Sequence, residues 1–217
     1  MRTIAVIARK GGSGKTTIAT HLALGAWLRG RRTLLADTDP QRSSAQVLEA
    51  RRGKGPERAE CTGPRLCAVQ MAAMRNRFEA LIVDTPAGAE EELSCALVLS
   101  DLALLVLRPT WLDMAAVVRT VDIVRRLKKP VLVALNQAPA AREGVEPPSV
   151  VRALKALKLL RLSAAPQVIR ARQVYQTALE SGRSVEELTL DRAAAREMGE
   201  FMNFIDGFAL SRRSGAA

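Results

Sequence analysis

The chain has 217 residues, of which 48% are hydrophobic and 25% are charged, and its formal net charge is +11. This length fits one domain with a sizeable core, and the hydrophobic fraction excludes an intrinsically disordered chain. The excess of lysine and arginine favours an anionic partner, and an aromatic content of 3% argues against a protein that stacks single-stranded bases.

The length of the apolar runs and the spacing of the cysteines indicate the cellular compartment. No apolar run approaches the roughly 20 residues that a membrane-spanning helix needs, and no signal peptide precedes the first predicted strand. We therefore expect a cytoplasmic protein with no membrane partner. Cys61, Cys67 and Cys95 form no C-x-x-C pair, which favours reduced thiols over an iron–sulfur site.

The first elements in chain order are a strand predicted over residues 4–8, a glycine-rich loop and a helix predicted over residues 16–29. The loop sequence is Lys10-Gly11-Gly12-Ser13-Gly14-Lys15-Thr16-Thr17. It fits the phosphate-loop pattern G-x-x-x-x-G-K-[ST] except at the first glycine, where Arg9 stands, and its strand–loop–helix context is the one the motif needs. The N–H groups of such a loop bind phosphate, and Lys15 would reach the β- and γ-phosphates of ATP. The Thr16 hydroxyl would ligate Mg²⁺.

Two later strands end in carboxylates. A strand over residues 33–36 leads to Asp37-Thr38-Asp39-Pro40-Gln41, and a strand over residues 81–84 ends at Asp84. The carboxyl ends of parallel strands lie beside the phosphate loop in open α/β sheets. Asp84 would therefore hold Mg²⁺, directly or through water, and Asp37 would support the metal's ligand shell. Because an aspartate before a proline also starts helices, an N-cap role can coexist with the metal role.

Residues 51–64 are rich in glycine, proline and charged side chains, which predicts an exposed and mobile loop. A short strand over residues 66–69 and a short helix over residues 71–77 follow. The remaining elements are predicted as a helix over 90–99, a strand over 102–107, a helix over 113–128, a strand over 130–135, a helix over 149–157, an edge strand over 159–162 and a helix over 191–210. Alternating strands and helices predict one doubly wound α/β domain, residues 1–217, with a mostly parallel sheet covered by helices on both faces.

The last predicted helix carries an apolar face. Its members are Met198, Phe201, Met202, Ile205 and Phe208. We expect this face to pack on the sheet, because a membrane-binding tail would need more flanking basic residues than Arg212 and Arg213.

Basic residues gather in the second half of the chain. Twelve basic and three acidic residues lie between Arg119 and Arg172, so most of the net charge belongs to this segment. Such a segment favours an anionic partner, although solvated helix faces have the same composition. Within it, the strand over residues 130–135 leads to Asn136, whose amide can both donate to and accept from the edge of an adenine ring. A turn-forming asparagine is the alternative.

Lys10 carries a resemblance that extends along nearly the whole chain. The sequence K-G-G-x-G-K-T-T resembles the deviant Walker A motif of the ParA/MinD group of P-loop ATPases. Residues 37–41 resemble switch I of that family, and residues 84–88 resemble its switch II. Residues 169–175 and 182–185 resemble the pattern I-x-x-R-Q-V-Y…G-x-S-V of the small ParA proteins, which have no N-terminal helix-turn-helix domain.

The resemblance assigns roles to individual residues. It implies that Lys10 crosses to the nucleotide of a partner subunit and that Asp39 positions the water that attacks ATP. Pro109 falls in a segment that contacts nucleotide and partner subunit, and Trp111 beside it is expected in the core or in a dimer interface. Arg172 matches a DNA-contacting arginine, the alternative being an ion pair with a glutamate of residues 180–187. The secondary DNA candidates are Arg170, Arg152, Lys155 and Lys158.

The resemblance also implies a mechanism. An ATP-dependent sandwich homodimer would bind double-stranded DNA without sequence preference, and the protein is therefore expected on the nucleoid. A ParB-like protein would stimulate hydrolysis and release the dimer, and repeated cycles would move a plasmid or a chromosome. One alternative is a MinD-like ATPase that cycles on membranes, and another is a carrier of a protein cargo such as a chemoreceptor cluster or a carboxysome. A metabolic enzyme similar to dethiobiotin synthetase is a third, against which Lys10 counts.

Overall fold

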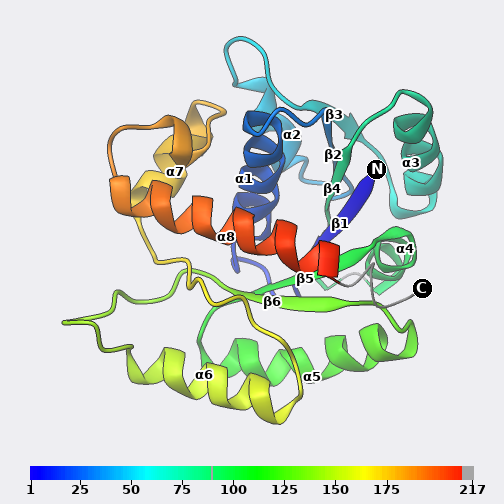
Figure 1. Ribbon diagram of the computed structural model, residues 1–217. Coiled ribbons are helices and arrows are strands. Elements are labelled where there is room, and N and C mark those ends of the chain that lie inside the picture. The colour runs from blue at the N-terminus through cyan, green and yellow to red at the C-terminus, as the bar shows by residue number, and fades with distance from the viewer. Residues whose placement is uncertain (89, 212–217) are drawn as a thin grey trace.

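A parallel sheet with helices on both faces forms the framework of the protein (Figure 1). The computed structural model describes residues 1–88 and 90–211. The strands of this part of the chain are β1 (Arg2–Ile7), β2 (Thr33–Asp37), β3 (Glu57–Glu60), β4 (Ala80–Asp84), β5 (Leu102–Leu107) and β6 (Val131–Leu135). They run in the order β3-β2-β4-β1-β5-β6, and every neighbouring pair is parallel. The predicted doubly wound α/β fold is confirmed.

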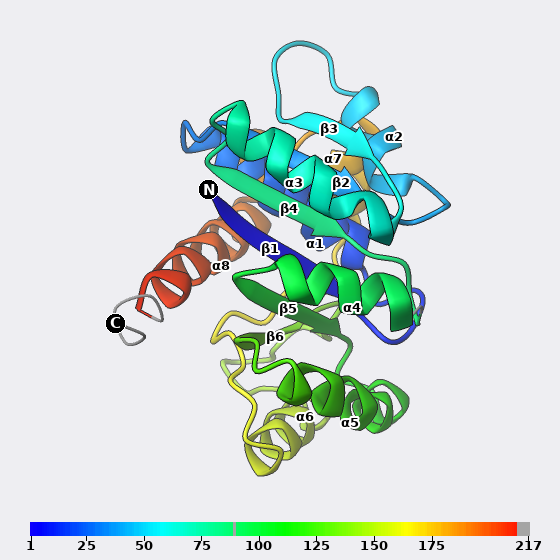
Figure 2. The same ribbon diagram turned by 90° about the vertical axis from the view of Figure 1, so that its right-hand side faces the viewer.

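Helices cover the two faces of the sheet in separate groups. The helices on one face are α1 (Lys15–Leu28), α2 (Ser43–Glu49), α7 (Gln173–Glu180) and α8 (Arg192–Ser211). The helices on the other face are α3 (Leu66–Arg75), α4 (Glu90–Leu99), α5 (Trp111–Arg126) and α6 (Pro148–Leu159). Figure 2 shows the second group facing the viewer, with α5 and α6 next to each other beyond β6.

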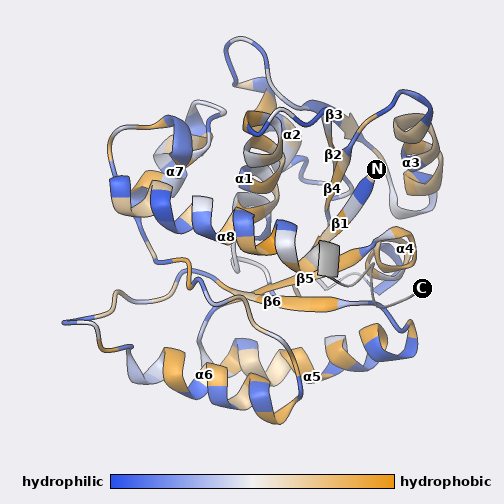
Figure 3. Ribbon diagram, in the orientation of Figure 1, coloured by the Kyte–Doolittle hydropathy of each residue, from blue (hydrophilic) through white to orange (hydrophobic). Residues whose placement is uncertain are grey.

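Hydrophobic patterning explains this layering. Every residue of β5 is buried and none is charged, as a strand covered on both faces requires. Because side chains alternate along a strand, Leu104 belongs to the core under α1 and α8, and Leu105 belongs to the core under α4 and α5. Figure 3 shows the same contrast, with β5 and β6 hydrophobic along their length and α5 and α6 alternating in character.

The last helix packs on the sheet as predicted. Its apolar residues Met198, Phe201, Met202 and Ile205 are buried, and Phe208 packs against the same core. Arg212 and Arg213, the basic residues considered for a membrane-binding tail, lie outside the described residues. Across the part of the chain that the structure describes, no helix combines the length and the apolar character needed to cross a membrane.

Three predicted elements differ from the structure. Residues 57–60, predicted as loop, form β3 at the edge of the sheet, where solvent exposure removes the need for an apolar pattern. Residues 66–69, predicted as a strand, begin α3, whose Leu66 and Ala73 are buried two helical turns apart. Residues 159–162 form no edge strand, because α6 ends at Leu159 and Arg161 turns the chain with a φ of 54°.

The G-x-S-V segment joins the end of α2 to the C-terminal part of the chain. Gly182 has a φ of +64°, and a Cβ on it would lie 2.5 Å from the backbone N of Arg51. The Arg51 guanidinium donates to the Gly182 carbonyl at 2.9 Å and forms an ion pair with Glu187 at 2.7 Å. The Ser184 hydroxyl caps the short 3₁₀ helix Val185–Glu187. The segment that resembles the small ParA pattern therefore has a packing role here.

Replacing Gly182 by alanine should destabilise the fold more than the same change at Gly144. Gly144 also has a positive φ, +77°, but faces open space, so Gly144→Ala should cost only the left-handed backbone penalty of about 1 kcal/mol. Gly182→Ala must also displace the Arg51 backbone, so we expect a loss of roughly 2–4 kcal/mol in the free energy of unfolding. Urea unfolding measures both variants, and equal losses would contradict the close approach of the two backbones.

Candidate nucleotide-binding site

The candidate site lies where the central strands end. The register of β2 against β4 places Asp37 opposite Asp84, and β1, paired with β4, delivers the phosphate loop beside them. Three segments that are far apart in the sequence therefore meet at the carboxyl ends of the central strands. The sequence predicted this meeting from the carboxylates that follow two of the strands.

Glycines let the phosphate loop approach Asn136 closely. Gly12 and Gly14 have positive φ values of 72° and 84°. The side-chain amide of Asn136 donates to the Ser13 carbonyl at 2.8 Å, and a Cβ on Gly14 would collide with that amide. Asn136 is buried in this position and fixes the loop backbone, a role that sequence reasoning missed. Its contact with adenine stays a prediction.

The first turn of α1 directs backbone N–H groups toward the position where the loop would hold a phosphate. The helix begins at Lys15 with Gly14 as its N-cap, and no side chain of the described residues caps it. Such a helix end is an anion-binding site, because its N–H groups and its dipole both favour negative charge. Lys15 is itself buried and adds a full positive charge. Phosphate on the loop would therefore satisfy backbone donors and a buried ammonium together.

Asp84 has the properties of a cation ligand. It is buried, and neither of its oxygens accepts a hydrogen bond of normal geometry from the described residues. Burial, followed by the charge of Asp37, raises the pKa of Asp84 from 3.8 to about 7, while the Lys15 ammonium and the nearby Thr16 and Ser44 hydroxyls act in the opposite direction. A buried carboxylate without a donor is unfavourable unless a cation pairs with it, and Mg²⁺ prefers oxygen ligands. Asp84 and the Thr16 hydroxyl are the residues that would hold it.

Asp37 is already engaged within the protein. Its carboxylate accepts hydrogen bonds from the Ser44 hydroxyl at 2.7 Å, the Ala45 N–H at 3.0 Å and the Asp39 N–H at 3.0 Å. It therefore caps the start of α2 and could assist a metal only from outside the first ligand shell. Asp39 is half-buried, and its Oδ1 accepts from the Gln41 N–H at 2.9 Å.

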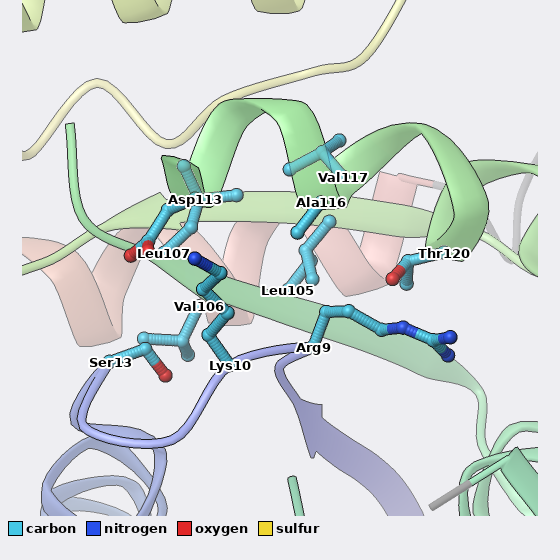
Figure 4. A pocket seen from close by; sticks show the side chains of 10 residues that line it. All are labelled: Arg9, Lys10, Ser13, Leu105, Val106, Leu107, Asp113, Ala116, Val117 and Thr120. Carbon is cyan, nitrogen blue, oxygen red and sulfur yellow. The ribbon is translucent and has the colours of Figure 1, made fainter. Parts of the chain in front are cut away.

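Lys10 points toward α5. Figure 4 shows its side chain extending from the loop to the start of this helix. A narrow cavity separates the two segments; its lining includes Lys10, Ser13, Asp113, Ala116, Val117 and Thr120. Pro109 is buried just before α5. Trp111, the first residue of α5, lies on the outward face of the helix and is 80% exposed, so the core alternative for this residue is wrong.

A larger open cavity of about 420 Å³ adjoins the phosphate loop. It is lined by Thr17, Asn136, Gln137, Arg170, Ala171, Arg172, Gln173, Tyr175 and Gln176. Its volume lies within the range of small-molecule sites, about 300–1,000 Å³, and it suits the nucleoside part of a nucleotide whose phosphates lie on the loop. The sequence identified the R-Q-V-Y segment as a family pattern, but nothing in its periodicity predicted that it lines this cavity.

His21 supports the wall of this cavity as a packing residue. Its Nδ1 lies 2.8 Å from the Thr17 carbonyl, and its ring meets Tyr175 edge to face with centroids 5.4 Å apart. Burial lowers the pKa of His21 to about 4, so the ring is neutral near pH 7. The absence of a second metal-type ligand near His21 in the sequence of this helix favours a packing or surface histidine over a functional one, and the buried ring identifies it as a packing residue.

The structure divides the predicted DNA contacts into two groups. Arg170 forms an ion pair with Glu146 at 2.5 Å, and Arg172 pairs with Asp191 at 3.4 Å rather than with a glutamate of residues 180–187. Both arginines line the cavity beside the phosphate loop. The other three candidates are exposed on α6, and they are Arg152, Lys155 and Lys158.

Phosphate on the loop and a cation on Asp84 would lie side by side at the carboxyl ends of the parallel strands. This is the arrangement of P-loop nucleotide-binding domains. Residues 4–200 match the family described as CobQ/CobB/MinD/ParA nucleotide binding domain, and the chain belongs to this family. The resemblance to the ParA/MinD group is thereby confirmed.

Several proteins are similar to this chain in sequence or in fold. The chain is 30% identical over 216 residues to the maintenance of carboxysome distribution protein A of Halothiobacillus neapolitanus, covering 93% of this chain and 94% of that protein. The cell division ATPase MinD of Pyrococcus furiosus has a similar fold, with a TM-score of 0.77 and 18% identity, covering 95% of this chain and 99% of that one. A plasmid partition protein of Borrelia burgdorferi B31 bound to AMPPNP has a TM-score of 0.70 and 13% identity, with coverage of 95% and 99%.

Asp84→Asn should stabilise the nucleotide-free protein at high pH. Because the folded state holds the Asp84 proton up to about pH 7, and the ordinary pKa of this group is 3.8, the carboxyl lowers stability as pH rises through that range. The neutral amide avoids this penalty, so we expect a gain of roughly 2–4 kcal/mol at pH 8 and little change at pH 4. Urea unfolding without nucleotide or metal measures it, and a gain independent of pH would contradict the assignment. The same variant should lose the Mg²⁺-dependent part of its stabilisation by ATP.

Proposed function

We propose that this protein is a ParA-type positioning ATPase that dimerises with ATP and separates on hydrolysis. The observation that carries the proposal is Lys10, whose side chain extends from the loop toward the start of α5 (Figure 4). In this proposal Lys15 binds the β- and γ-phosphates of the bound nucleotide. Lys10 is a second lysine of the same loop, and it is available for the nucleotide of a partner subunit.

Each residue of the site has a role in this proposal. Lys15 and the loop N–H groups bind the β- and γ-phosphates. Thr16 and Asp84 hold Mg²⁺, which neutralises phosphate charge. Asp39 orients the attacking water through Oδ2, since its Oδ1 is fixed by the Gln41 N–H at 2.9 Å.

Two substitutions should separate dimerisation from hydrolysis. Lys10→Ala should bind ATP as a monomer but fail to dimerise, because the charge that reaches the second nucleotide is gone. Asp39→Ala should dimerise with ATP and hydrolyse it at least about 100-fold more slowly, because the water is no longer oriented. Size-exclusion chromatography with ATP and a phosphate-release assay measure both, and a stable Lys10→Ala dimer would rule out the role across the interface.

We further propose that the basic surface of α5 and α6 binds DNA without sequence preference. The two helices are neighbours, and their exposed basic residues and those just after them are Arg119, Arg125, Arg126, Lys128, Arg152, Lys155, Lys158 and Arg161. Exposed cations bind phosphate by releasing counterions, which needs no recognition of the bases. The ion pairs of Arg170 and Arg172 make these two arginines less available for that role.

The double change Arg152→Ala and Lys155→Ala should weaken DNA binding and leave the ATP-dependent dimer intact. We expect affinity to fall at least about fivefold, and the slope of log affinity against log salt to fall by about one for each phosphate that is no longer neutralised. Arg172→Ala is the matched control and should keep wild-type DNA affinity. Fluorescence anisotropy on random-sequence duplex at several salt concentrations measures all three proteins. Loss of DNA binding in Arg172→Ala alone, with the dimer intact, would move the DNA-binding surface to the α7 side.

A protein assembly is the second candidate for the cargo. The identity of 30% over nearly the full length to a carboxysome distribution protein supports this candidate. The DNA surface has a use in both cases, because nucleoid DNA would be the track along which either cargo moves. The cargo is therefore chosen by surfaces other than the basic face of α5 and α6.

A further inference from the structure

One wall of the larger cavity beside the phosphate loop is held in place from α8. This wall consists of residues 170–176, which are called the wall segment below. The Tyr175 hydroxyl donates to Oε1 of Glu197 on α8 at 2.8 Å, and the backbone N–H of Arg170 donates to the same oxygen at 2.9 Å. Figure 1 shows α7, which contains Tyr175, close to the first turns of α8. One carboxylate oxygen therefore fixes two separate points of the wall segment.

The wall segment is also held at its first residues. Asp191, which precedes α8, accepts from the Ala194 N–H at 2.9 Å and from the Arg172 guanidinium at 3.4 Å, so it joins the start of the helix to the wall. On the other side, the Arg170 guanidinium donates to the Pro139 carbonyl at 2.9 Å. The wall segment is therefore fixed between α8 and the loop that follows β6.

A series of hydrogen bonds connects this wall with the phosphate loop. The Ala171 N–H donates to the Ala138 carbonyl at 2.9 Å. Two residues before Ala138, the side-chain amide of Asn136 donates to the Ser13 carbonyl at 2.8 Å. Glu197 lies at the far end of this series, on a helix that sequence reasoning connected only with packing on the sheet.

Burial makes the acceptor on Glu197 important for the shape of the wall. Tyr175 is 5% exposed, and burial, followed by the charge of Glu197, raises the pKa of its hydroxyl, which stays protonated and donates. Without Glu197 Oε1, this buried hydroxyl and the Arg170 N–H both lose their partner, which is unfavourable for each group. The wall segment must then move to find other acceptors, and the cavity changes shape with it.

We propose that Glu197 is a positioning residue for nucleotide binding, which holds the wall segment in the shape that receives the nucleoside part of ATP. This inference rests on the proposed function, because it takes the cavity as the nucleoside site. Glu197 acts through Tyr175 and Arg170 and does not itself touch the nucleotide.

Docking of α8 on the sheet is a separate matter from this role. The helix is held by its buried apolar residues Met198, Phe201, Met202 and Ile205. By contrast, both hydrogen bonds that Glu197 accepts within the described part of the chain come from the wall segment. A loss of Glu197 should therefore affect the cavity more than the attachment of the helix.

Glu197→Leu tests the positioning role in the full-length protein. Titration calorimetry with Mg²⁺ and a non-hydrolysable ATP analogue should show an affinity at least about fivefold lower than that of the unsubstituted protein, because two hydrogen bonds are lost. Affinity for tripolyphosphate, which occupies the phosphate loop without a nucleoside, should not change. Glu197→Gln should keep both affinities, since its amide oxygen can accept the same two bonds.

Two further variants sharpen the test. Glu200→Leu is the matched control, because Glu200 is exposed one turn later on α8, and it should alter neither affinity. Tyr175→Phe removes one of the two bonds, so the double variant with Glu197→Leu should bind the analogue no more weakly than Glu197→Leu alone. Thermal unfolding confirms that every variant folds.

The outcomes separate this inference from the proposed function. A folded Glu197→Leu protein that binds the analogue like the unsubstituted protein would overturn the positioning role and leave the proposed function intact. Equal losses for the analogue and for tripolyphosphate would do the same, because the effect would then not come from the cavity wall. If the unsubstituted protein binds neither compound, the proposed function and the positioning role are both overturned.

Discussion

A buried carboxylate with no hydrogen bond of normal geometry from the described residues is the constraint on which the nucleotide site depends. Asp84 sits at the end of a central strand, where neighbours on both sides exclude water and bring its pKa to about 7. Lys15, also buried, has the opposite sign but does not fully neutralise it. A phosphate with its metal ion supplies a cation that pairs with the Asp84 carboxylate and an anion that pairs with the Lys15 ammonium. Binding of nucleotide and stability of the fold are therefore linked.

The fold separates the basic residues of segment 119–172 into two groups. These residues follow one another along the chain, but they lie at two different sites on the molecule. Arg152 and Lys155 are exposed on α6, whereas Arg170 and Arg172 lie in ion pairs beside the phosphate loop. Charge density along a sequence predicts an anionic partner, but only the backbone path between the residues decides which anion each one meets.

Sequence reasoning succeeded where the physics is local or periodic. The strand–loop–helix of the phosphate loop, the charge-free strand 102–107 and the carboxylate at Asp84 all follow from patterns within a few residues. It failed at residues 57–60, where an exposed edge strand needs no apolar alternation, and it left Trp111 open between the core and a dimer interface, of which the exposed side chain excludes the core. The hydrogen bond of Asn136 with Ser13 and the close approach of Gly182 to Arg51 join distant segments, and no spacing in the sequence encodes them.

The edge strand β3 has a consequence for how the protein behaves at high concentration. A parallel sheet has two open edges, and unprotected edges of different molecules join into fibres. Here Glu57, Arg58 and Glu60 place charge along one edge, and the opposite edge is bridged by the chain at Ala164. Backbone-to-backbone polymerisation is thereby suppressed at both ends of the sheet. The association and separation that we propose would then run through other surfaces, and the open edges of the sheet would not lock the molecules into an irreversible aggregate.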